Sequence, residues 1–474
     1  LEQWGNRLRG ALENRVICGL EIPRGYRKDR EEWKRMSKVV KFGGSSLASA
    51  EQFRKVGDIV RSDAERRYVV PSAPGKRFDK DSKVTDMLYA CYELAEAGKD
   101  FREALEAIRA RYREIVSGLE LSVDLDGEFG IIEKNFLAKA GRDYAASRGE
   151  YLNGIIMAAY LDFEFVDAAE VIRFDGNGSF NAEETNRVLA ERLGACRYAV
   201  IPGFYGAKPD GEVKTFSRGG SDITGSIVAK AVLADVYENW TDVSGFFVTD
   251  PRIIENARGI DVITYRELRE LSYMGAGVLH EESIFPVRQE NIPINIRNTN
   301  SPDDNGTWIV GSTCQKSKYV ITGIAGKKGF CSINIEKDKM NSEIGFGRKV
   351  LQTFEENGIS FEHVPSGIDT MTVFVHQDEF MHKEQKVVAS LYRTAKPDTI
   401  EIESDLALIA VVGRGMKATR GTAGRIFSAL SHANVNVKMI DQGSSELNII
   451  IGVANDDFET AIKAIYDIFV LTNL

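Results

Sequence analysis

The chain has 474 residues, which is longer than a single hydrophobic core usually organises, so we expect at least two domains. Its composition, with 43% hydrophobic and 28% charged residues and no low-complexity tract, is typical of a globular protein. The net charge of -9 argues against nucleic acid as the main partner, because phosphate binding requires a basic face. No apolar run is long enough to span a bilayer, and none resembles a signal peptide.

The five cysteines are scattered and form no CxxC pair, so the sequence indicates neither a zinc site nor a disulfide framework. This usage fits a reducing compartment, and we expect a cytoplasmic location. Residues 1–35 are basic and arginine-rich and have no sustained periodicity. We expect them to be a leader or an artificial extension, with the folded unit beginning at Met36.

From Val39 to about Ile309, short apolar segments alternate with amphipathic ones. Strands are expected at 39–42, 68–73, 163–168, 198–204, 234–242 and 293–298. Helical patterns lie between them, at 50–64, 221–234 and 264–276. Buried strands separated by helices predict a mainly parallel sheet with helices on both faces. Ligands of such sheets bind beyond the carboxyl ends of the strands, where the glycine-rich turns lie.

The first expected strand runs into a glycine pair, in the sequence VKFGGSSL at 40–47. Lys41 lies inside the strand, and Gly43, Gly44 and Ser45 form the turn. Backbone N–H groups at a helix start favour an anion. The lysine precedes the glycines, so this is not a P-loop, and the HRD and DFG signatures of protein kinases are missing. By itself the turn is either a phosphate cradle or a closely packed strand-to-helix turn.

A second glycine pair lies in SRGGSD at 217–222 and also runs into a helical pattern. The planar guanidinium of Arg218 suits a carboxylate, and Ser221 or Asp222 suits the N-cap position of the helix. A loop with a surface ion pair is the alternative. Two glycine-paired helix starts in one α/β domain favour a ligand site.

Two further motifs are weak when taken alone. In WTDVSGFFVTDPR at 240–252, Asp242 and Asp250 suit a ribose or a magnesium ion and Arg252 suits a phosphate, but TDP is also a common turn. Glu150 stands at the head of an apolar segment, where an acid normally does no more than stabilise the helix dipole. His280 has no second histidine at ligand spacing, so we expect a structural role or a helix cap.

After a polar loop and edge strand at 298–312, the chain repeats itself. Segments 330–375 and 406–453 match at an offset of 76 residues without a gap, and each predicts strand, helix, strand, strand, helix. The matched pairs are Ile333 with Ile409, Leu351 with Phe427, Ile359 with Val435, and Gly367 with Gly443. The repeat predicts two small α+β modules in tandem.

The three motifs and the repeat together resemble aspartate kinases of the amino-acid kinase superfamily, from about Met36 to the last residue. The repeat resembles the paired ACT domains of those enzymes. The resemblance implies an αβα sandwich with a mainly parallel central sheet, followed by two ferredoxin-like ACT modules. The expected domains are a catalytic domain at 36–312, a first ACT domain at 318–395 and a second at 400–474. Because the sequence stops after the second copy, it is similar to the monofunctional enzymes and not to the fusions with homoserine dehydrogenase.

The resemblance implies transfer of the γ-phosphoryl group of ATP to the β-carboxylate of L-aspartate, giving 4-phospho-L-aspartate and ADP. This is the first step of lysine, threonine and methionine biosynthesis, with feedback by end products through the ACT domains. Mg²⁺ would be held mainly through ATP, so no protein metal ligand is predicted. Lysine, threonine or both are the implied effectors, and pairing of ACT modules implies a homodimer or a larger oligomer. The alternative is a non-catalytic amino-acid sensor on a kinase fold.

The resemblance also assigns roles to residues. Lys41 would stabilise the transferred phosphoryl group, Asp222 would hold Lys41, and Arg218 would pair with the α-carboxylate of aspartate. Glu150 would bind the substrate ammonium. The other aspartate-binding candidates are Ser72, Thr85, Gly219, Gly220 and Ser221. The ATP-binding candidates are Lys41, Gly43, Gly44, Ser45, Thr241, Asp242, Phe247, Asp250 and Arg252.

Two further implications concern regulation and the nucleotide. The effector candidates are Met340, Ser342, Gly345, Phe346, Phe361, Glu362, Val364 and Ser366. Many relatives have GAKVLHP where this chain has GAGVLHE, so Gly277 replaces a nucleotide-contacting lysine and Glu281 replaces a proline. We expect weaker ATP binding unless Lys214, Arg252 or another cation compensates.

Overall fold

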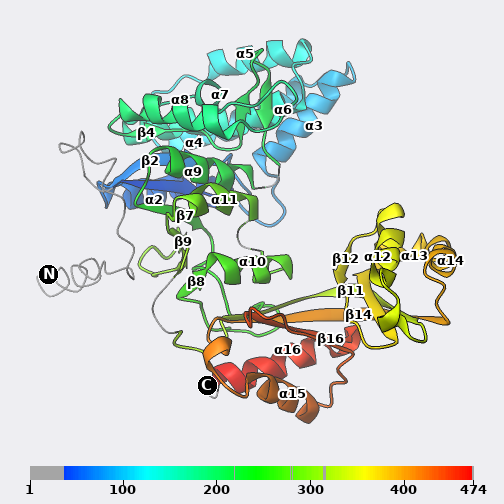
Figure 1. The fold of residues 1–474 in the computed structure, drawn as a ribbon. Coiled ribbons are helices and arrows are strands. Elements are labelled where there is room, and N and C mark those ends of the chain that lie inside the picture. Colours follow the sequence, from blue (N-terminus) through cyan, green and yellow to red (C-terminus); the bar gives the residue numbers. More distant parts are fainter. Residues whose placement is uncertain (1–36, 218, 278, 280, 313–316, 472–474) are drawn as a thin grey trace, which may run out of the picture. The chain divides into compact units, whose positions relative to one another are not determined.

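The computed structural model describes residues 37–217, 219–277, 279, 281–312 and 317–471 (Figure 1). The expected leader at 1–35 lies outside the described residues. The chain divides into two compact units, each described by itself. The first consists of Leu1–Ser244 with Glu282–Lys316, and the second of Gly245–Glu281 with Ser317–Leu474. Residues 245–281, placed in the catalytic domain by the sequence, thus cluster with the C-terminal part of the chain.

The first unit contains a mainly parallel sheet, as predicted. Its strands lie in the order β3-β4-β2-β1-β7-β9-β10, and only the β9–β10 pair is antiparallel. The strands are β1 (Lys38–Phe42), β2 (Arg66–Pro71), β3 (Glu164–Phe165), β4 (Ala199–Val200), β7 (Val236–Thr241), β9 (Ile294–Asn298) and β10 (Thr307–Val310). A separate antiparallel hairpin is formed by β5 (Tyr205–Ala207) and β6 (Val213–Thr215). All six strands expected from the sequence occur.

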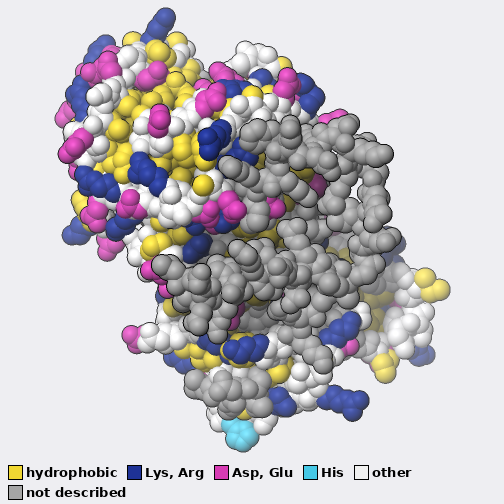
Figure 2. All heavy atoms as spheres, turned by 90° about the vertical axis from the view of Figure 1, so that its left-hand side faces the viewer, with side chains coloured by type: hydrophobic (Ala, Val, Ile, Leu, Met, Phe, Trp, Pro, Cys, Tyr) yellow, Lys and Arg dark blue, Asp and Glu magenta, His cyan; other side chains and the backbone are white. Residues whose placement is uncertain are grey.

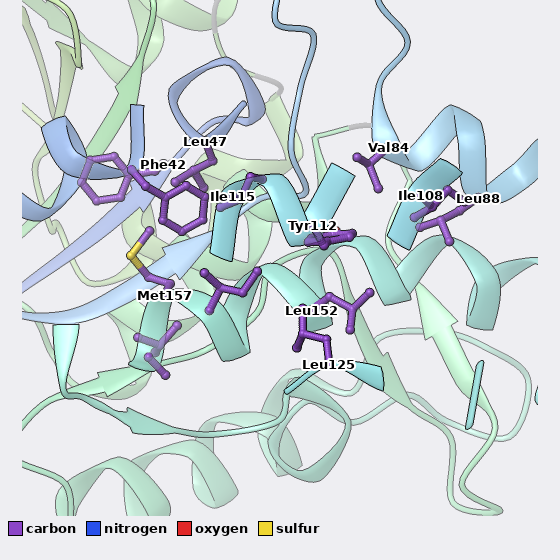
Figure 3. Close-up of a cluster of buried hydrophobic side chains, with 14 of the residues drawn as sticks. Phe42, Leu47, Val84, Leu88, Ile108, Tyr112, Ile115, Leu125, Leu152 and Met157 are labelled. Carbon is purple, nitrogen blue, oxygen red and sulfur yellow. The ribbon is translucent and has the colours of Figure 1, made fainter. Parts of the chain in front are cut away.

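Helices cover both faces of this sheet. They are η2 (Gly44–Leu47), α2 (Ala50–Arg61), α3 (Val84–Glu96), α4 (Arg102–Gly118), α5 (Asp126–Leu137), α6 (Arg142–Leu161), α7 (Ala168–Val171), α8 (Ala182–Gly194), α9 (Gly220–Ala231) and α11 (Glu281–Gln289). Helices α2 to α6 pack on one face, where Phe42 and Leu47 join Tyr112, Ile115 and Met157 in a buried hydrophobic cluster (Figure 3). Burial of this cluster supplies the main driving force for the unit.

Helix α9 packs on the other face and brings its first turn to the carboxyl ends of the strands. It approaches β7 closely because Gly225 has no side chain, and a Cβ there would lie 2.5 Å from the Tyr237 hydroxyl oxygen. Gly219, in the left-handed region at φ 73°, is the N-cap residue. The expectation of Ser221 or Asp222 at the N-cap is therefore wrong, because α9 begins earlier and both residues lie in its first turn.

The second unit begins with β8 (Val262–Thr264) and α10 (Tyr265–Tyr273) and continues with the repeat. The first copy comprises β11 (Gly323–Glu336), η3 (Met340–Ser342), α12 (Phe346–Glu356), β12 (Phe361–His363), β13 (Thr370–His376), α13 (Gln377–Met381) and α14 (Glu384–Thr394). The second comprises β14 (Thr399–Val412), η4 (Met416–Ala418), α15 (Thr422–His432), β15 (Met439–Asp441), β16 (Asn448–Ala454), η5 (Asn455–Asp457), α16 (Phe458–Tyr466) and η6 (Asp467–Leu471). Their strands form one antiparallel sheet in the order β12-β13-β11-β14-β16-β15. The prediction of two tandem α+β modules is confirmed.

The repeat is exact over its first half and shifted over its second. Strand β14, η4 and α15 begin and end 76 residues after β11, η3 and α12, but β16 begins 78 residues after β13. The gapless match of Gly367 with Gly443 is therefore wrong by two residues. Ile359 and Val435 are equivalent buried residues, each with its N–H bonded five residues back to a residue of the preceding helix. The two extra residues consequently lie between Val435 and β15.

Two properties of the described residues concern membrane crossing and surface charge. Among the described residues, no helix combines the length and apolar character needed to cross a bilayer. On the face shown in Figure 2, basic and acidic side chains are interspersed around apolar ones.

Candidate active site

Lys41 and Asp222 form a buried ion pair at the end of β1. The Nζ atom of Lys41 lies 2.6 Å from Oδ1 of Asp222, and the two side chains are only 9% and 16% exposed. Asn239 on β7 donates from Nδ2 to the same Oδ1 at 2.8 Å. Lys41 and Asn239 are direct neighbours in the pairing of β1 with β7, so their side chains share one face of the sheet. The ammonium group is thereby held in a fixed place with little solvent around it.

The glycine turn after β1 packs backbone against backbone on a second turn. The N–H of Gly43 donates to the carbonyl of Trp240 at 3.0 Å, and the N–H of Gly75 donates to the carbonyl of Gly44 at 2.8 Å. A Cβ on Gly44 would lie 2.8 Å from the carbonyl oxygen of Ala73, and a Cβ on Gly75 would lie 2.6 Å from the carbonyl carbon of Gly44. Only glycine fits this approach. Ser45, exposed, follows at the start of η2.

Glu150 is a buried acid without a full set of partners. It lies in the middle of α6, so its interpretation as a first-turn acid is wrong, because the helix begins eight residues earlier. The residue is 5% exposed, and Oε2 has no hydrogen-bond partner among the described residues. Burial raises the pKa of Glu150 to about 8, against hydrogen bonds from the N–H groups of Ala73 and Glu150 and the charge of Lys41. The carboxyl is thus mostly uncharged at neutral pH and would ionise beside an incoming cation.

The two expected substrate hydroxyls flank a loop at 72–83. Ser72 follows β2, its N–H donates to the carbonyl of Phe42 at 3.1 Å, and Asn153 of α6 donates from Nδ2 to its carbonyl at 2.6 Å. Thr85 is the second residue of α3, and the N–H of Val84 closes the loop on the carbonyl of Pro74 at 3.1 Å. Ser72 therefore lies at the same sheet edge as Lys41, since β1 and β2 are parallel neighbours.

The first turn of α9 lies against the end of β2. The N–H of Gly203 donates to the carbonyl of Pro71 at 3.1 Å, and a Cβ on Gly203 would lie 2.7 Å from Cβ of Ser221. Gly219, Gly220 and Ser221 are thereby brought to the Lys41–Asp222 pair, because Asp222 belongs to the same turn. Arg218, the expected partner of the α-carboxylate, lies outside the described residues.

The expected ATP contacts divide between the two units. In the first unit Thr241 ends β7, the N–H of Thr299 donates to its carbonyl at 2.9 Å, and Asp242 follows it on the surface. Phe247, Asp250 and Arg252 belong to the second unit. There Nη2 of Arg252 lies 2.6 Å from Oδ2 of Asp250, and this hydrogen bond lowers the pKa of Asp250.

Gly277, which replaces the lysine of many relatives, has free space where a side chain would lie. A Cβ on Gly277 would meet only the carbonyl oxygen of Gly275, at 3.9 Å. The expected substitute Lys214 is already paired, since its Nζ lies 2.7 Å from Oδ2 of Asp143. Arg252 is paired with Asp250 but 89% exposed. His280 lies outside the described residues.

The effector candidates divide into a buried and an exposed group. Buried or packed against the hydrophobic core of the first copy are Met340, Phe346 and Val364. Glu362 has a side chain only 7% exposed and lies 3.3 Å from Nε2 of His376. Exposed to solvent are Ser342, Gly345, Phe361 and Ser366.

The loop that carries several of these candidates, before α12, is clamped by one acid. The carboxylate of Glu343 lies 2.5 Å from Nζ of both Lys337 and Lys349. Hydrogen bonds from these two lysines lower the pKa of Glu343 to about 2. Glu343 therefore links a residue before η3 to a residue of α12.

Sequence reasoning missed three polar side chains that shape the site: Arg111, Asn153 and Asn239. A signal exists for Arg111, which lies three residues after Ile108 and one before Tyr112, on the apolar face of α4. A buried arginine on such a face requires polar partners. Asn153 is likewise one turn after Glu150 on α6. For Asn239, strand pairing with Lys41 was needed.

Comparisons with known proteins identify the family. The model of the amino acid kinase family matches residues 36–298, more than half of the chain, and an ACT domain model matches residues 409–469. The chain is 42% identical over 450 residues to aspartokinase 3 of Bacillus subtilis, covering 91% of this chain and 98% of that protein. The chain belongs to the aspartokinases. The prediction made from three motifs and a repeat is confirmed, and this member of the family is an ATP-using phosphotransferase.

Solved structures of aspartokinases have the same fold. The aspartate kinase of Clostridium acetobutylicum is 52% identical, with a TM-score of 0.84, and the match covers 92% of this chain and all of that one. Aspartokinase III of E. coli in complex with aspartate and ADP is 26% identical, with a TM-score of 0.70, covering 91% of this chain and 99% of that one.

Proposed function

We propose that the end of β1, the first turn of α9 and the middle of α6 form the catalytic centre of an aspartate kinase. The enzyme transfers the γ-phosphoryl group of ATP to the β-carboxylate of L-aspartate. The observation that carries this proposal is the buried Lys41–Asp222 pair beside Glu150, whose Oε2 has no partner among the described residues. A fixed cation and an acid without a partner are the groups that a phosphoryl group and a substrate ammonium require. The likeness to an enzyme solved with aspartate and ADP supports the choice of substrates.

In this mechanism the protein positions charges and performs little covalent chemistry itself. Lys41 stabilises the negative charge on the phosphoryl group as it is transferred. Asp222 holds the Lys41 side chain in place, and Asn239 holds Asp222. The N–H of Gly44 follows in the turn beside Lys41, whereas that of Gly43 is bonded to the carbonyl of Trp240. Glu150 accepts a hydrogen bond from the substrate ammonium, and Ser72, Thr85 and Ser221 line the aspartate site. The family resemblance assigns the α-carboxylate of aspartate to Arg218. These side chains hold the acceptor carboxylate in line with the phosphoryl group.

We place the ATP phosphates at the glycine turn, beside the Lys41 ammonium group. Thr241 and Asp242, at the end of β7, extend this site. Phe247, Asp250 and Arg252 stay predicted nucleotide contacts by the family resemblance. Mg²⁺ bound through ATP would supply positive charge to the transferred group, and we propose no protein ligand for it.

The tandem repeat regulates the enzyme by binding an end-product amino acid, lysine, threonine or both. The start of α12 offers backbone N–H groups for the effector carboxylate, and the exposed residues Ser342 and Gly345 directly precede this helix. The edge strand β12 carries Phe361 at 47% exposure, which suits pairing with a second chain into a homodimer.

The test is formation of an acyl phosphate, trapped with hydroxylamine, in the presence of ATP and L-aspartate. Lys41→Met should reduce kcat by about 10³-fold, the scale measured when one charge-stabilising group is removed. Lys55→Met, on the exposed side of α2, is the matched control and should retain wild-type kinetics. Wild-type rates in Lys41→Met, or no trapped product from the wild-type chain, would contradict the proposal.

A further inference from the structure

Arg111 of α4 lies outside every motif of the site, yet its guanidinium reaches both site turns. The side chain is 4% exposed. Its Nη2 donates to the carbonyl of Gly75 at 2.8 Å and to the carbonyl of Ala48 at 3.2 Å, and Nη1 donates to Oδ2 of Asp81 at 2.7 Å. Ala48 ends the turn that begins with Gly43, and Gly75 and Asp81 belong to the 72–83 loop. One side chain therefore ties the phosphate turn to the loop between the two substrate hydroxyls.

Arg111 bridges the two turns where their backbones are already in contact. The Gly75 N–H donates to the carbonyl of Gly44, and neither glycine leaves room for a side chain. Contact between two bare backbones provides little apolar burial to hold it. The guanidinium adds the stabilisation that this contact lacks, because its planar N–H groups donate to carbonyls of both turns at once.

Asp81 fixes Arg111 from the far end of the loop. It also accepts hydrogen bonds from the backbone and side chain of Arg77, at 2.9 Å from N and from Nε. These bonds, with that from Arg111, hold the pKa of Asp81 well below its usual range. Asp81 therefore stays charged at any working pH and keeps the loop on α4.

The next residue anchors the same helix to the acid of the site. Tyr112 of α4 belongs to the buried cluster that also contains Leu88 of α3 and Leu152 of α6 (Figure 3), and its hydroxyl donates to the carbonyl of Gly149 at 2.7 Å, directly before Glu150. Helix α4 thus contacts the phosphate turn, the 72–83 loop and the part of α6 that carries Glu150.

We propose that Arg111 is a positioning residue of the phosphoryl-transfer site, which sets the distance between the phosphate turn and the aspartate-binding loop. This inference rests on the proposed function for the identity of the two ligands. An error of about 1 Å between reacting groups costs on the order of 100-fold in rate, so the loss of this tie has a large effect.

Arg66 provides a matched control. It is also a buried arginine, 6% exposed, paired with a buried acid, since its Nε lies 2.8 Å from Oε2 of Glu238. It stands at the start of β2, whereas the 72–83 loop leaves from the end of that strand. Replacement of either arginine by lysine removes the same planar fork from a buried ion pair, but only Arg111 joins the site turns.

The experiment compares Arg111→Lys, Arg66→Lys and Asp81→Asn in the full chain. Hydrogen exchange followed by mass spectrometry measures the amides of residues 72–83, and steady-state kinetics measures kcat and the KM values for aspartate and ATP. We expect Arg111→Lys to speed exchange in the loop by at least about tenfold, to raise KM for aspartate by about tenfold and to lower kcat by about tenfold. Asp81→Asn should change the same quantities less, and Arg66→Lys should leave them as in wild type.

Loop exchange in Arg111→Lys at the wild-type rate would overturn the proposal, as would equal changes in Arg66→Lys. If the wild-type chain forms no acyl phosphate, the proposed function is what fails, and the exchange comparison still decides whether Arg111 holds the loop.

Discussion

Glu150 and Glu267 are both glutamates buried within helices, one in each unit, and their surroundings differ. Glu267 on α10 is 0% exposed, and its carboxylate accepts hydrogen bonds from Thr264, Thr322 and Arg414 at 2.6–2.9 Å. Burial alone would raise the pKa of Glu267, but these hydrogen bonds outweigh it and lower the pKa. At Glu150 the effect of burial exceeds that of the hydrogen bonds and nearby charges, and the pKa rises to about 8.

The difference separates a structural acid from a binding acid. Glu267 joins α10 to Thr322, just before β11, and to Arg414, just after β14, so its charge is fully used inside the second unit. One oxygen of Glu150 has no partner among the described residues. Buried polar groups in native proteins are normally satisfied, so an exception of this kind indicates a ligand.

The largest effect is expected from Glu150→Gln. The amide keeps the shape of the carboxyl but has no charge for the substrate ammonium, so kcat/KM for aspartate should fall by about 10³-fold. The free energy of unfolding at pH 7 should not fall, because the native carboxyl is already mostly protonated there. Steady-state kinetics and urea unfolding measure the two quantities. A large loss of stability with little loss of kcat/KM would place Glu150 with the structural acids.

The opposite pattern is expected from Glu267→Gln. The new NH₂ group would face donors from Thr264 and Arg414, and the half-buried guanidinium would lose its countercharge, so unfolding of the second unit should become about 3 kcal/mol easier. Calorimetry of the full chain measures this loss. Because the pKa of Glu267 is lowered, its contribution is present above pH 4.5 and disappears as pH falls through the folded pKa. A variant as stable as wild type would contradict the interpretation of Glu267 as a structural acid.

The pH dependence of aspartate binding should reflect Glu150 alone. Its raised pKa means that the empty protein holds an extra proton between pH 4.5 and about 8, so stability falls as pH rises through this window. Ionisation for the substrate ammonium costs progressively less over the same range. KM for aspartate should therefore fall by about tenfold between pH 6 and 7 and by about fivefold between pH 7 and 8. Glu150→Gln should show a flat profile, and a flat profile in wild type would contradict the assignment.

The smallest effect is expected from Glu343→Gln, which removes an acid at the protein surface. Its two lysine partners are solvated, and surface ion pairs contribute little. The melting temperature and kcat should match wild type within error. A marked drop in melting temperature would show that burial is not what separates the two glutamates from other acids.

The sequence predicted the parts of the site that local motifs encode. Lys41 and Asp222 stand at glycine-paired turns, and the expected strands bring them to one sheet edge. The helical register of α4 contained a signal for Arg111 that only became interpretable once its acceptors were known. The partners of Glu267 are not predictable in this way, because Arg414 lies 147 residues away and meets it only through tertiary packing.

The repeat illustrates the same limit. Periodicity predicted the elements of both copies, but the two-residue insertion before β15 is evident only from strand pairing, where Ile333 meets Val373 and Ile409 meets Ile451. Similarly, residues 245–281 read as a continuation of the α/β pattern, yet they cluster with the C-terminal unit, partly through Glu267.

Proton release on aspartate binding tests the central claim most directly. Isothermal titration at pH 7, in two buffers with different ionisation enthalpies, counts the protons released when aspartate binds to the full chain. With the Glu150 pKa at about 8 in the empty protein, the count should be close to one proton per aspartate, and it should vanish in Glu150→Gln. A count of zero in the wild-type protein would show that Glu150 is already charged before the substrate arrives and would contradict its role as the binding acid.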